Sequence, residues 1–387
     1  MAGYENQGRI RNKLKITKQT KISATFVCFV IFVCFVFSPG VQGQSDSFEK
    51  IAAQAAQAKD ANQIDQAMSL YRQALRLNPK WGEGWFYLAT LLYDRDSFAE
   101  AAEAFREATN LSPKIGTAWV MLGLSEYKLG RHDDSLEHLQ KGRQLGITDN
   151  PHLRNVMLFH EGLLLLHKAD FDAAYRTLSK LSRDGVENDD LINALGLSVL
   201  RLRPSEKHQS EIVRQAGQAE YFATQKKFDE ALKGYERLVQ EFPREQNVHY
   251  AYGRYLLTCN NEEKAIEAFK QEIANDPSHL MARLLIADTK LRLRDYAGGL
   301  PFAEEAVKLR PDLPLAHYLV GSLLLETGKT LQAINELETA RRLLPDEPKI
   351  HFALGRAYAR ANRKADAERA RATFERLNKQ AEETVKQ

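Results

Sequence analysis

A proline recurs every 34 residues in the C-terminal half of the chain, at Pro243, Pro277, Pro311 and Pro345. The segments that these prolines close share a pattern of small residues at fixed places. The earlier small position is Ala219, Gly253, Ala287 and Gly321, and the later one, twelve residues on, is Ala231, Ala265, Gly299 and Ala333. A period of this length is typical of stacked helix pairs, which bury their apolar faces only against neighbouring pairs. The sequence therefore predicts an all-α solenoid.

The same pattern continues towards the N-terminus. Trp85, Leu88 and Ala89 lie on one helical face, and Ala101 and Phe105 form the facing stripe. The spacing and these residues resemble the tetratricopeptide repeat (TPR), a helix–turn–helix unit. The resemblance implies a right-handed superhelical solenoid of antiparallel helix pairs, and a function in binding proteins or peptides.

Four regions follow from the pattern. Residues 1–43 form a basic and apolar leader, 48–147 hold three repeats, 148–211 a degenerate repeat with linker helices, and 212–387 the regular array with a C-terminal cap. Within the third region, Asp189 to Arg203 reads as a single helix without a full partner, and we expect a kink there.

The N-terminus has the order of a secretory signal peptide. Met1 to Lys21 carries six basic residues against Glu5, an apolar run covers residues 24–37, and small residues precede Gln44. Because the run is short for a membrane span, we expect cleavage before Gln44, with an uncleaved anchor over residues 22–37 as the alternative. Both interpretations predict an exported protein, periplasmic or extracellular, and the uncleaved form adds membrane association.

The charge of the chain limits the class of partner, and its cysteines limit the disulfides that can form. The formal net charge is +3, but the basic N-terminus supplies more than this, so the remainder is slightly acidic. Nucleic acid is therefore not expected as a partner, because its binding needs a basic stripe. Cys259 is the one cysteine beyond the apolar run, so the exported part must fold without an internal disulfide.

No sequence motif predicts catalysis. His160, Glu161 and His167 lack the His-Glu-x-x-His spacing of zinc proteases. Gly328-Lys329-Thr330 imitates the end of a phosphate loop but lies at an expected turn between repeat helices. We expect no enzyme activity, no cofactor and no metal.

The TPR resemblance places a binding groove on the inner face of the first helix of each unit. Its positions in the C-terminal array correspond to Asn247, Tyr250, Arg254, Asp288, Arg292, Tyr318, Ser322, Lys349, Phe352, Arg356 and Arg360. Arginine and aromatic residues are common at protein interfaces. We therefore expect an extended protein or peptide partner with acidic character, while a merely solvated helix face remains the alternative.

Two functions follow. The first is a non-enzymatic protein- or peptide-binding scaffold in the cell envelope or exported compartment. The second is a structural subunit of a larger envelope, secretion or assembly complex, which could self-associate through residues 148–211 or through the end near Phe374.

Overall fold

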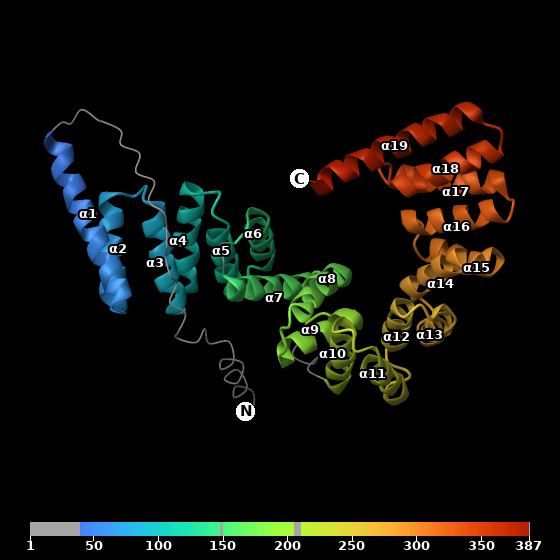
Figure 1. The fold of residues 1–387 in the computed structure, drawn as a ribbon, viewed down its shortest axis with the longest axis horizontal. Helices are drawn as coiled ribbons and strands as arrows, with labels where there is room; N and C mark the ends of the chain where they lie inside the picture. The colour runs from blue at the N-terminus through green and yellow to red at the C-terminus, as the bar shows by residue number, and fades with distance from the viewer. Residues whose placement is uncertain (1–38, 148–149, 205–209, 387) are drawn as a thin grey trace.

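The computed structural model describes residues 39–147, 150–204 and 210–386, which form nineteen helices and no strand (Figure 1). The N-terminal helices are α1 (Pro39–Asp60), α2 (Ile64–Leu77), α3 (Gly82–Asp94), α4 (Phe98–Leu111), α5 (Gly116–Lys128) and α6 (His132–Leu145). The central helices are α7 (Pro151–His167), α8 (Phe171–Arg183), α9 (Asp189–Val199), α10 (Glu211–Thr224) and α11 (Phe228–Glu241). The C-terminal helices are α12 (Val248–Thr258), α13 (Glu262–Asn275), α14 (Leu280–Arg292), α15 (Tyr296–Leu309), α16 (Pro314–Glu326), α17 (Thr330–Leu343), α18 (Pro348–Arg360) and α19 (Lys364–Lys386). The predicted all-α solenoid of antiparallel helix pairs is confirmed.

Each helix pair closes through the same turn. After α12, Asn260 adopts φ 54°, and the Asn261 amide donates to the Leu256 carbonyl at 2.9 Å. This is a Schellman arrangement, in which a left-handed residue ends a helix and satisfies its last carbonyls. The left-handed residues of the nine turns are Asn62, Asp96, Gly130, Ala169, Lys226, Asn260, Arg294, Gly328 and Asn362.

The small residues of the repeat lie where two helices of one pair come closest. A Cβ atom at Gly253 would lie 2.6 Å from Cε1 of Phe269, which is fully buried. A Cβ atom at Gly321 would likewise lie 2.6 Å from Cγ of Leu337. The glycine of the first helix therefore leaves room for the large residue of the second, which confirms the register inferred from the sequence.

The irregular region contains one helix more than whole pairs require. Helix α9 packs against α10, and a Cβ atom at Gly217 would lie only 1.8 Å from the Ile192 carbonyl oxygen. Helix α10 also packs against α11. Thus α9, expected to lack a full partner, shares the first helix of the next pair.

The hydrophobic core is continuous through this region. One cluster of buried side chains runs from Val120 of α5 to Tyr255 of α12 and includes residues of all the helices between them. Apolar burial is the main stabilising contribution in a solenoid, where each unit contacts only its neighbours. The segment 148–211 is therefore packed on both sides in its described residues.

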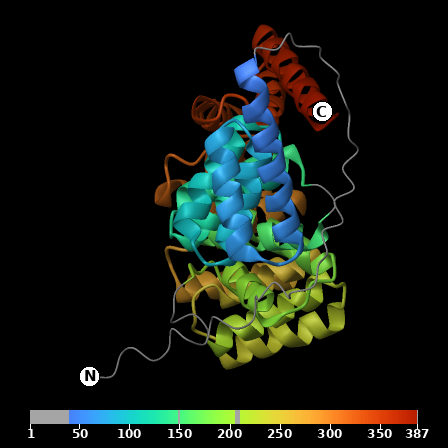
Figure 2. The same ribbon diagram turned by 90° about the vertical axis from the view of Figure 1, so that its left-hand side faces the viewer.

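The helices trace a U-shaped arch that opens upwards in Figure 1. Helices α1–α6 form one arm, α7–α11 the base, and α12–α19 a second arm that curves back towards the first (Figure 1). The view in Figure 2 agrees, with the base at the bottom and α19 at the top. The base thus joins two arms of stacked helix pairs.

The predicted leader falls mostly outside the described residues. Residues 1–38, which include the basic segment and the proposed anchor at 22–37, are not described, and the proposed cleavage point before Gln44 lies within the range of α1. In the described part of the chain, no helix combines the length and apolarity needed to span a membrane.

Candidate binding surface

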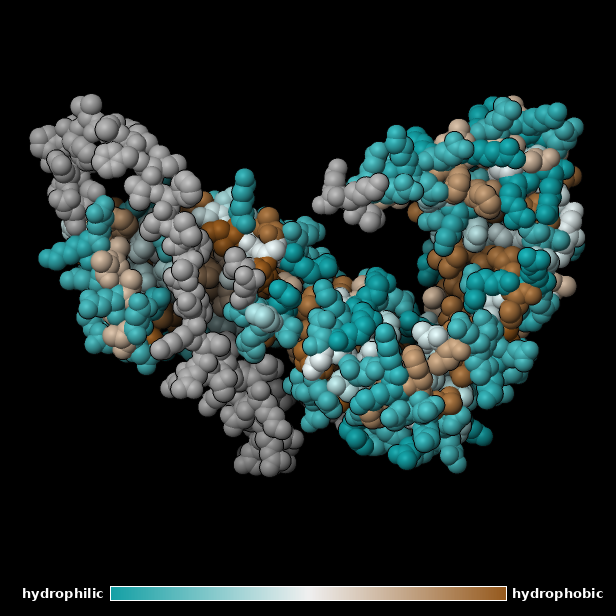
Figure 3. Space-filling model, viewed as in Figure 1, coloured by the Kyte–Doolittle hydropathy of each residue, from teal (hydrophilic) through white to brown (hydrophobic). Residues whose placement is uncertain are grey.

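The first helix of each pair lies on the inner side of the second arm. Along this arm α10 contacts α12, α14 contacts α16, and α16 contacts α18, whereas successive second helices are not packed as closely in the described chain. The closer spacing of first helices bends the stack towards them. We call the solvent-facing side of α10, α12, α14, α16 and α18 the C-terminal concave surface, and Figure 3 shows that this side of the arm borders an open hollow.

The concave surface continues onto a second helix at the base of the arch. Because α10 is shared between α9 and α11, it contacts α8 on one side and α12 on the other. Helix α8 therefore extends the line of first helices, although it is the second helix of its own pair. No sequence period predicts this exchange of faces, since it follows from the insertion of α9.

Each of the four predicted arginines has a carboxylate partner, and for three of them that partner lies in the second arm. Arg356 and Arg360 both reach Glu326, at 2.5 and 3.1 Å. Arg360 also donates to the Leu325 carbonyl. Arg292 lies 3.3 Å from Asp288 and 3.9 Å from Glu262. The two arginines on Glu326 lower its pKa against the opposing effect of burial, so this carboxylate remains charged and holds both side chains.

Two further predicted residues, Asn247 and Tyr250, belong to a helix cap. The buried carboxylate of Glu272 accepts the backbone amides of Asn247 and Tyr250 at 2.7 and 3.1 Å. His279 lies 3.0 Å from the Asn247 side-chain oxygen. A carboxylate at a helix N-terminus satisfies otherwise unpaired amides and the helix dipole. Glu272 thus stabilises the start of α12 through the backbone amides of Asn247 and Tyr250.

The remaining predicted residues are more open. Phe352 is 51% exposed and contacts Phe374 with ring centroids 5.3 Å apart, Lys349 is exposed, and Tyr318 is half-buried. The Ser322 hydroxyl is buried and has no hydrogen-bond partner among the described residues. This part of the surface offers apolar and aromatic contact area to a bound segment.

Arg254 lies apart from the others, in a cluster at the base of the arch. Its guanidinium lies 3.4 Å from Asp172 of α8 and against the rings of Tyr175 and Tyr250. Arg201, just after α9, lies 3.3 Å from the same carboxylate. Sequence reasoning missed Asp172, Tyr175 and Arg201 because they belong to the irregular region, where no repeat position identifies them.

Beneath this cluster a buried carboxylate is held by two tyrosines. Glu220 of α10 accepts the hydroxyl of Tyr175 at 2.7 Å and that of Tyr235. Burial and the Glu220 charge raise the pKa of both tyrosines well above their ordinary value. The hydroxyls therefore stay protonated and act as donors.

The histidines that resemble a metal motif do not converge. His160 is buried against the Tyr127 ring and contacts the Val156 carbonyl at 2.8 Å, while His167 lies against His132. Glu161 instead lies 3.3 Å from Arg143. Among the described residues, no group of three metal-ligating side chains is close enough to hold an ion. Gly328 occupies a helix turn, as its sequence position predicts.

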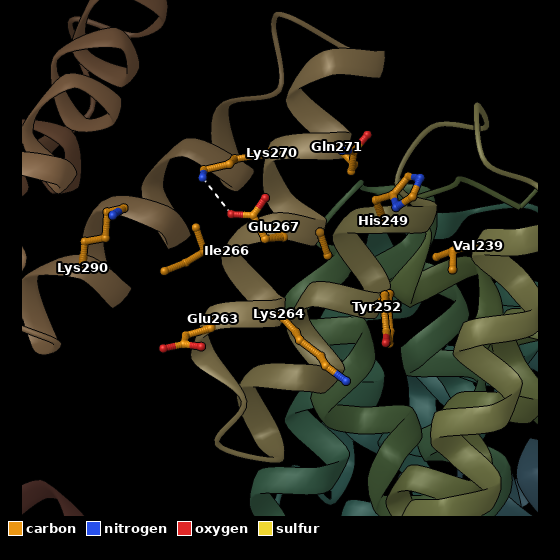
Figure 4. Close-up of a pocket in the computed structure, with 11 residues that line it drawn as sticks. Val239, His249, Tyr252, Glu263, Lys264, Ile266, Glu267, Lys270, Gln271 and Lys290 are labelled. Carbon is orange, nitrogen blue, oxygen red and sulfur yellow. Dashed lines mark hydrogen bonds and ion pairs between the residues drawn. The ribbon is translucent and has the colours of Figure 1, made fainter.

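Two cavities lie on the outer side of the solenoid. The larger, about 720 Å³, lies between α11, α13 and α14 over α12, with Tyr252 and Ile266 in its lining (Figure 4). The other, about 550 Å³, lies between α2 and α4 over α3. Both occupy the gaps that open between second helices when the first helices approach each other, so their position follows from the curvature.

A TPR family model matches most of the chain. Matches to "Tetratricopeptide repeat" cover residues 53–114, 94–150, 217–279, 260–314 and 318–373. Residues between 150 and 217, which contain most of the irregular region, have no match.

Several solved structures are similar over part of the chain. MamA (residues 41 to the end) from Desulfovibrio magneticus RS-1 is 22% identical, with 43% of this chain and 93% of that chain covered and a TM-score of 0.39. A crystal structure of MamA protein is 16% identical, with 44% and 94% covered and a TM-score of 0.41. Comparison with curated protein sequences gives no match. On the family matches and the repeated helix pairs, the chain belongs to the tetratricopeptide repeat family.

Proposed function

We propose that the chain is an exported, non-enzymatic scaffold that binds an extended acidic protein segment along the C-terminal concave surface. Proteins of this repeat family bind proteins or peptides, and the first helices of the second arm approach one another along one inner face. The observation that carries the proposal is the composition of that face, where Tyr318 and Phe352 supply apolar area and Arg254 supplies positive charge. Aromatic residues and arginine contribute most to protein interfaces.

A peptide selection on the full chain tests the choice of surface. Random peptides selected for binding are retested on Phe352→Glu and on Leu331→Glu, which lies at the start of α17, a second helix. Both wild-type residues are exposed, at 51% and 74%, and neither belongs to the buried core cluster of this arm. We expect Phe352→Glu to abolish binding and Leu331→Glu to preserve it. The reverse result would place the interface on the outer side.

Export is a separate part of the proposal, supported by the charge and apolar pattern of residues 1–43. The test is cell fractionation of the full chain followed by sequencing of its N-terminus. Cleavage predicts Gln44 as the first residue in the exported fraction, whereas an anchor predicts an intact N-terminus in the membrane fraction. Recovery in the cytosol would contradict both.

A structural subunit of a larger assembly remains the second candidate, favoured by the exposed Phe352–Phe374 contact at the end of the array. Light scattering distinguishes the two. A monomer at micromolar concentration supports the scaffold, whereas a concentration-dependent oligomer that Phe352→Glu dissociates supports the assembly.

A further inference from the structure

Two arginine side chains meet at the base of the arch, where the second arm begins. Arg201 follows α9 and Arg254 projects from α12, and both contact the Asp172 carboxylate of α8, at 3.3 and 3.4 Å. The three side chains come from parts of the chain up to 82 residues apart. They lie together because α10 contacts both α8 and α12, so that side chains of these two helices meet across it on the concave surface.

The positive charge of this pair is only partly balanced at the surface. Within the described residues, Asp172 is the one carboxylate at ion-pair distance from either guanidinium. Glu220, beneath, attracts Arg254 electrostatically, but its oxygens accept the tyrosine hydroxyls and it forms no ion pair with either guanidinium in the described chain. Each guanidinium has five N–H donors, and Asp172 engages one nitrogen of each at the long end of hydrogen-bond distance. Donors therefore remain for a second anion.

The aromatic residues around the pair fix its geometry. The Arg254 guanidinium lies 5.3 Å from the Tyr175 ring centroid, and that of Arg201 lies 5.1 Å from the Phe171 centroid. Both are also within 6 Å of the Tyr250 ring, at 5.9 and 5.8 Å. Stacking holds a guanidinium face and leaves its N–H edge available. Ordering these side chains before binding reduces the entropy that a ligand must overcome.

The side chains remain accessible. Those of Arg201 and Arg254 are 21% and 29% exposed, and that of Asp172 is 43% exposed. Arg356 and Arg360 differ from this pair, because they bind the Glu326 carboxylate at shorter distances and Arg360 also donates to a backbone carbonyl. The two arginine pairs have the same charge but differ in how closely their carboxylate lies, at 3.3 and 3.4 Å for Asp172 and at 2.5 and 3.1 Å for Glu326.

We propose that Arg201 and Arg254 form the recognition point for an acidic side chain of the bound segment, whose carboxylate accepts hydrogen bonds from both guanidinium groups. This rests on the proposed function and names the residues that select the partner. Asp172 holds the arginines in place when no ligand is bound and competes with the ligand carboxylate. Charge-assisted bonds to two arginines are among the stronger contacts available to a peptide carboxylate.

Binding of labelled hexaglutamate and hexaglutamine peptides to the full chain tests the proposal. Arg201→Gln with Arg254→Gln should weaken hexaglutamate binding at least about tenfold, because it removes charge-assisted hydrogen bonds. The matched control, Arg356→Gln with Arg360→Gln, removes the same charge from the same surface and should change binding by less than about threefold, in the range of screened exposed charges. Hexaglutamine should bind neither variant nor the wild type.

Asp172→Asn gives an independent test with the opposite sign. The substitution removes the competing carboxylate, so hexaglutamate should bind more tightly. If the two arginines had only a structural role, binding would be unchanged or weaker. Equal losses in the two double variants would show an effect of net charge alone and overturn the proposal. If hexaglutamate does not bind while selected peptides still bind in a Phe352-dependent manner, this inference fails and the proposed function stands.

Discussion

Replacement of Gly253 by alanine tests the packing register of the array. A Cβ atom at this position would lie 2.6, 2.8 and 3.0 Å from three atoms of the Phe269 ring. That ring is fully buried between α12 and α14 and cannot move without disturbing its neighbours. Overpacking of this kind costs about 1–3 kcal/mol. Alanine also favours the helix over glycine by about 1 kcal/mol, which offsets part of the loss.

Gly355→Ala is the matched control, because Gly355 holds the same place in the last pair. There the nearest atom to a new Cβ would be Cγ of Arg371, at 3.4 Å, which is ordinary contact with a flexible side chain. The gain in helix propensity is common to both variants. The free energy of unfolding should therefore differ between them by about 1–3 kcal/mol, with Gly355→Ala the more stable.

The assay should resolve individual helix pairs, since each unit of a solenoid contacts only its neighbours and unfolding of a long array is not all-or-none. Hydrogen exchange of peptides from α12–α13 and α18–α19 meets this need. We expect faster exchange in α12–α13 for Gly253→Ala and slower exchange in α18–α19 for Gly355→Ala. Equal shifts of the same sign in both variants would refute the register.

Three further predictions concern turns, caps and pH. Ala169→Gly should stabilise the α7–α8 pair by about 0.5–1 kcal/mol, because Ala169 has φ 59° in a turn that favours glycine; thermal unfolding measures the gain, and a lower melting temperature would contradict it. Glu272→Ala should cost about 1–3 kcal/mol and speed exchange at the start of α12, since two amides lose their acceptor. The exposed Glu263→Ala on the same helix should leave exchange at the start of α12 unchanged. Burial lowers the pKa of His160 from 6.5 to about 4, so the unfolded chain binds this proton first and stability is lost as pH falls from 6.5 to 4, by up to about 3 kcal/mol. His160→Leu should remove that part of the pH dependence in denaturant titrations, and an identical slope in the variant would show that His160 does not contribute.

The repeat period predicts most of the fold because its small and large residues lie where neighbouring helices pack against each other. The small residues at Gly253 and Gly321 lie against Phe269 and Leu337, as the register requires. The turns within pairs follow less closely from the period, since the left-handed residues that close them are as different as Ala169 and Gly328. Local spacing thus identifies the pairs without prescribing their turn residues.

The arrangement at the base of the arch could not be predicted in the same way. Gly196 and Gly217 allow α9 to approach α10 closely, but a glycine in a helix does not reveal which helix it meets. The contact between Asp172 and Arg254 joins residues from separate repeats and depends on that approach. The predicted site was chosen from repeat positions, which identify Arg254 but give no information on whether an arginine is already paired.

We propose above all that the acidic segment binds on the C-terminal concave surface, and site-specific photo-crosslinking tests this most directly. A benzophenone amino acid is placed at Tyr318 of α16, a predicted groove position, or at Gln271, beside the outer cavity of Figure 4. With labelled hexaglutamate, we predict a crosslink from position 318 that the Arg201→Gln/Arg254→Gln variant loses, and none from position 271. A crosslink from position 271 alone would contradict the account and assign binding to the outer side.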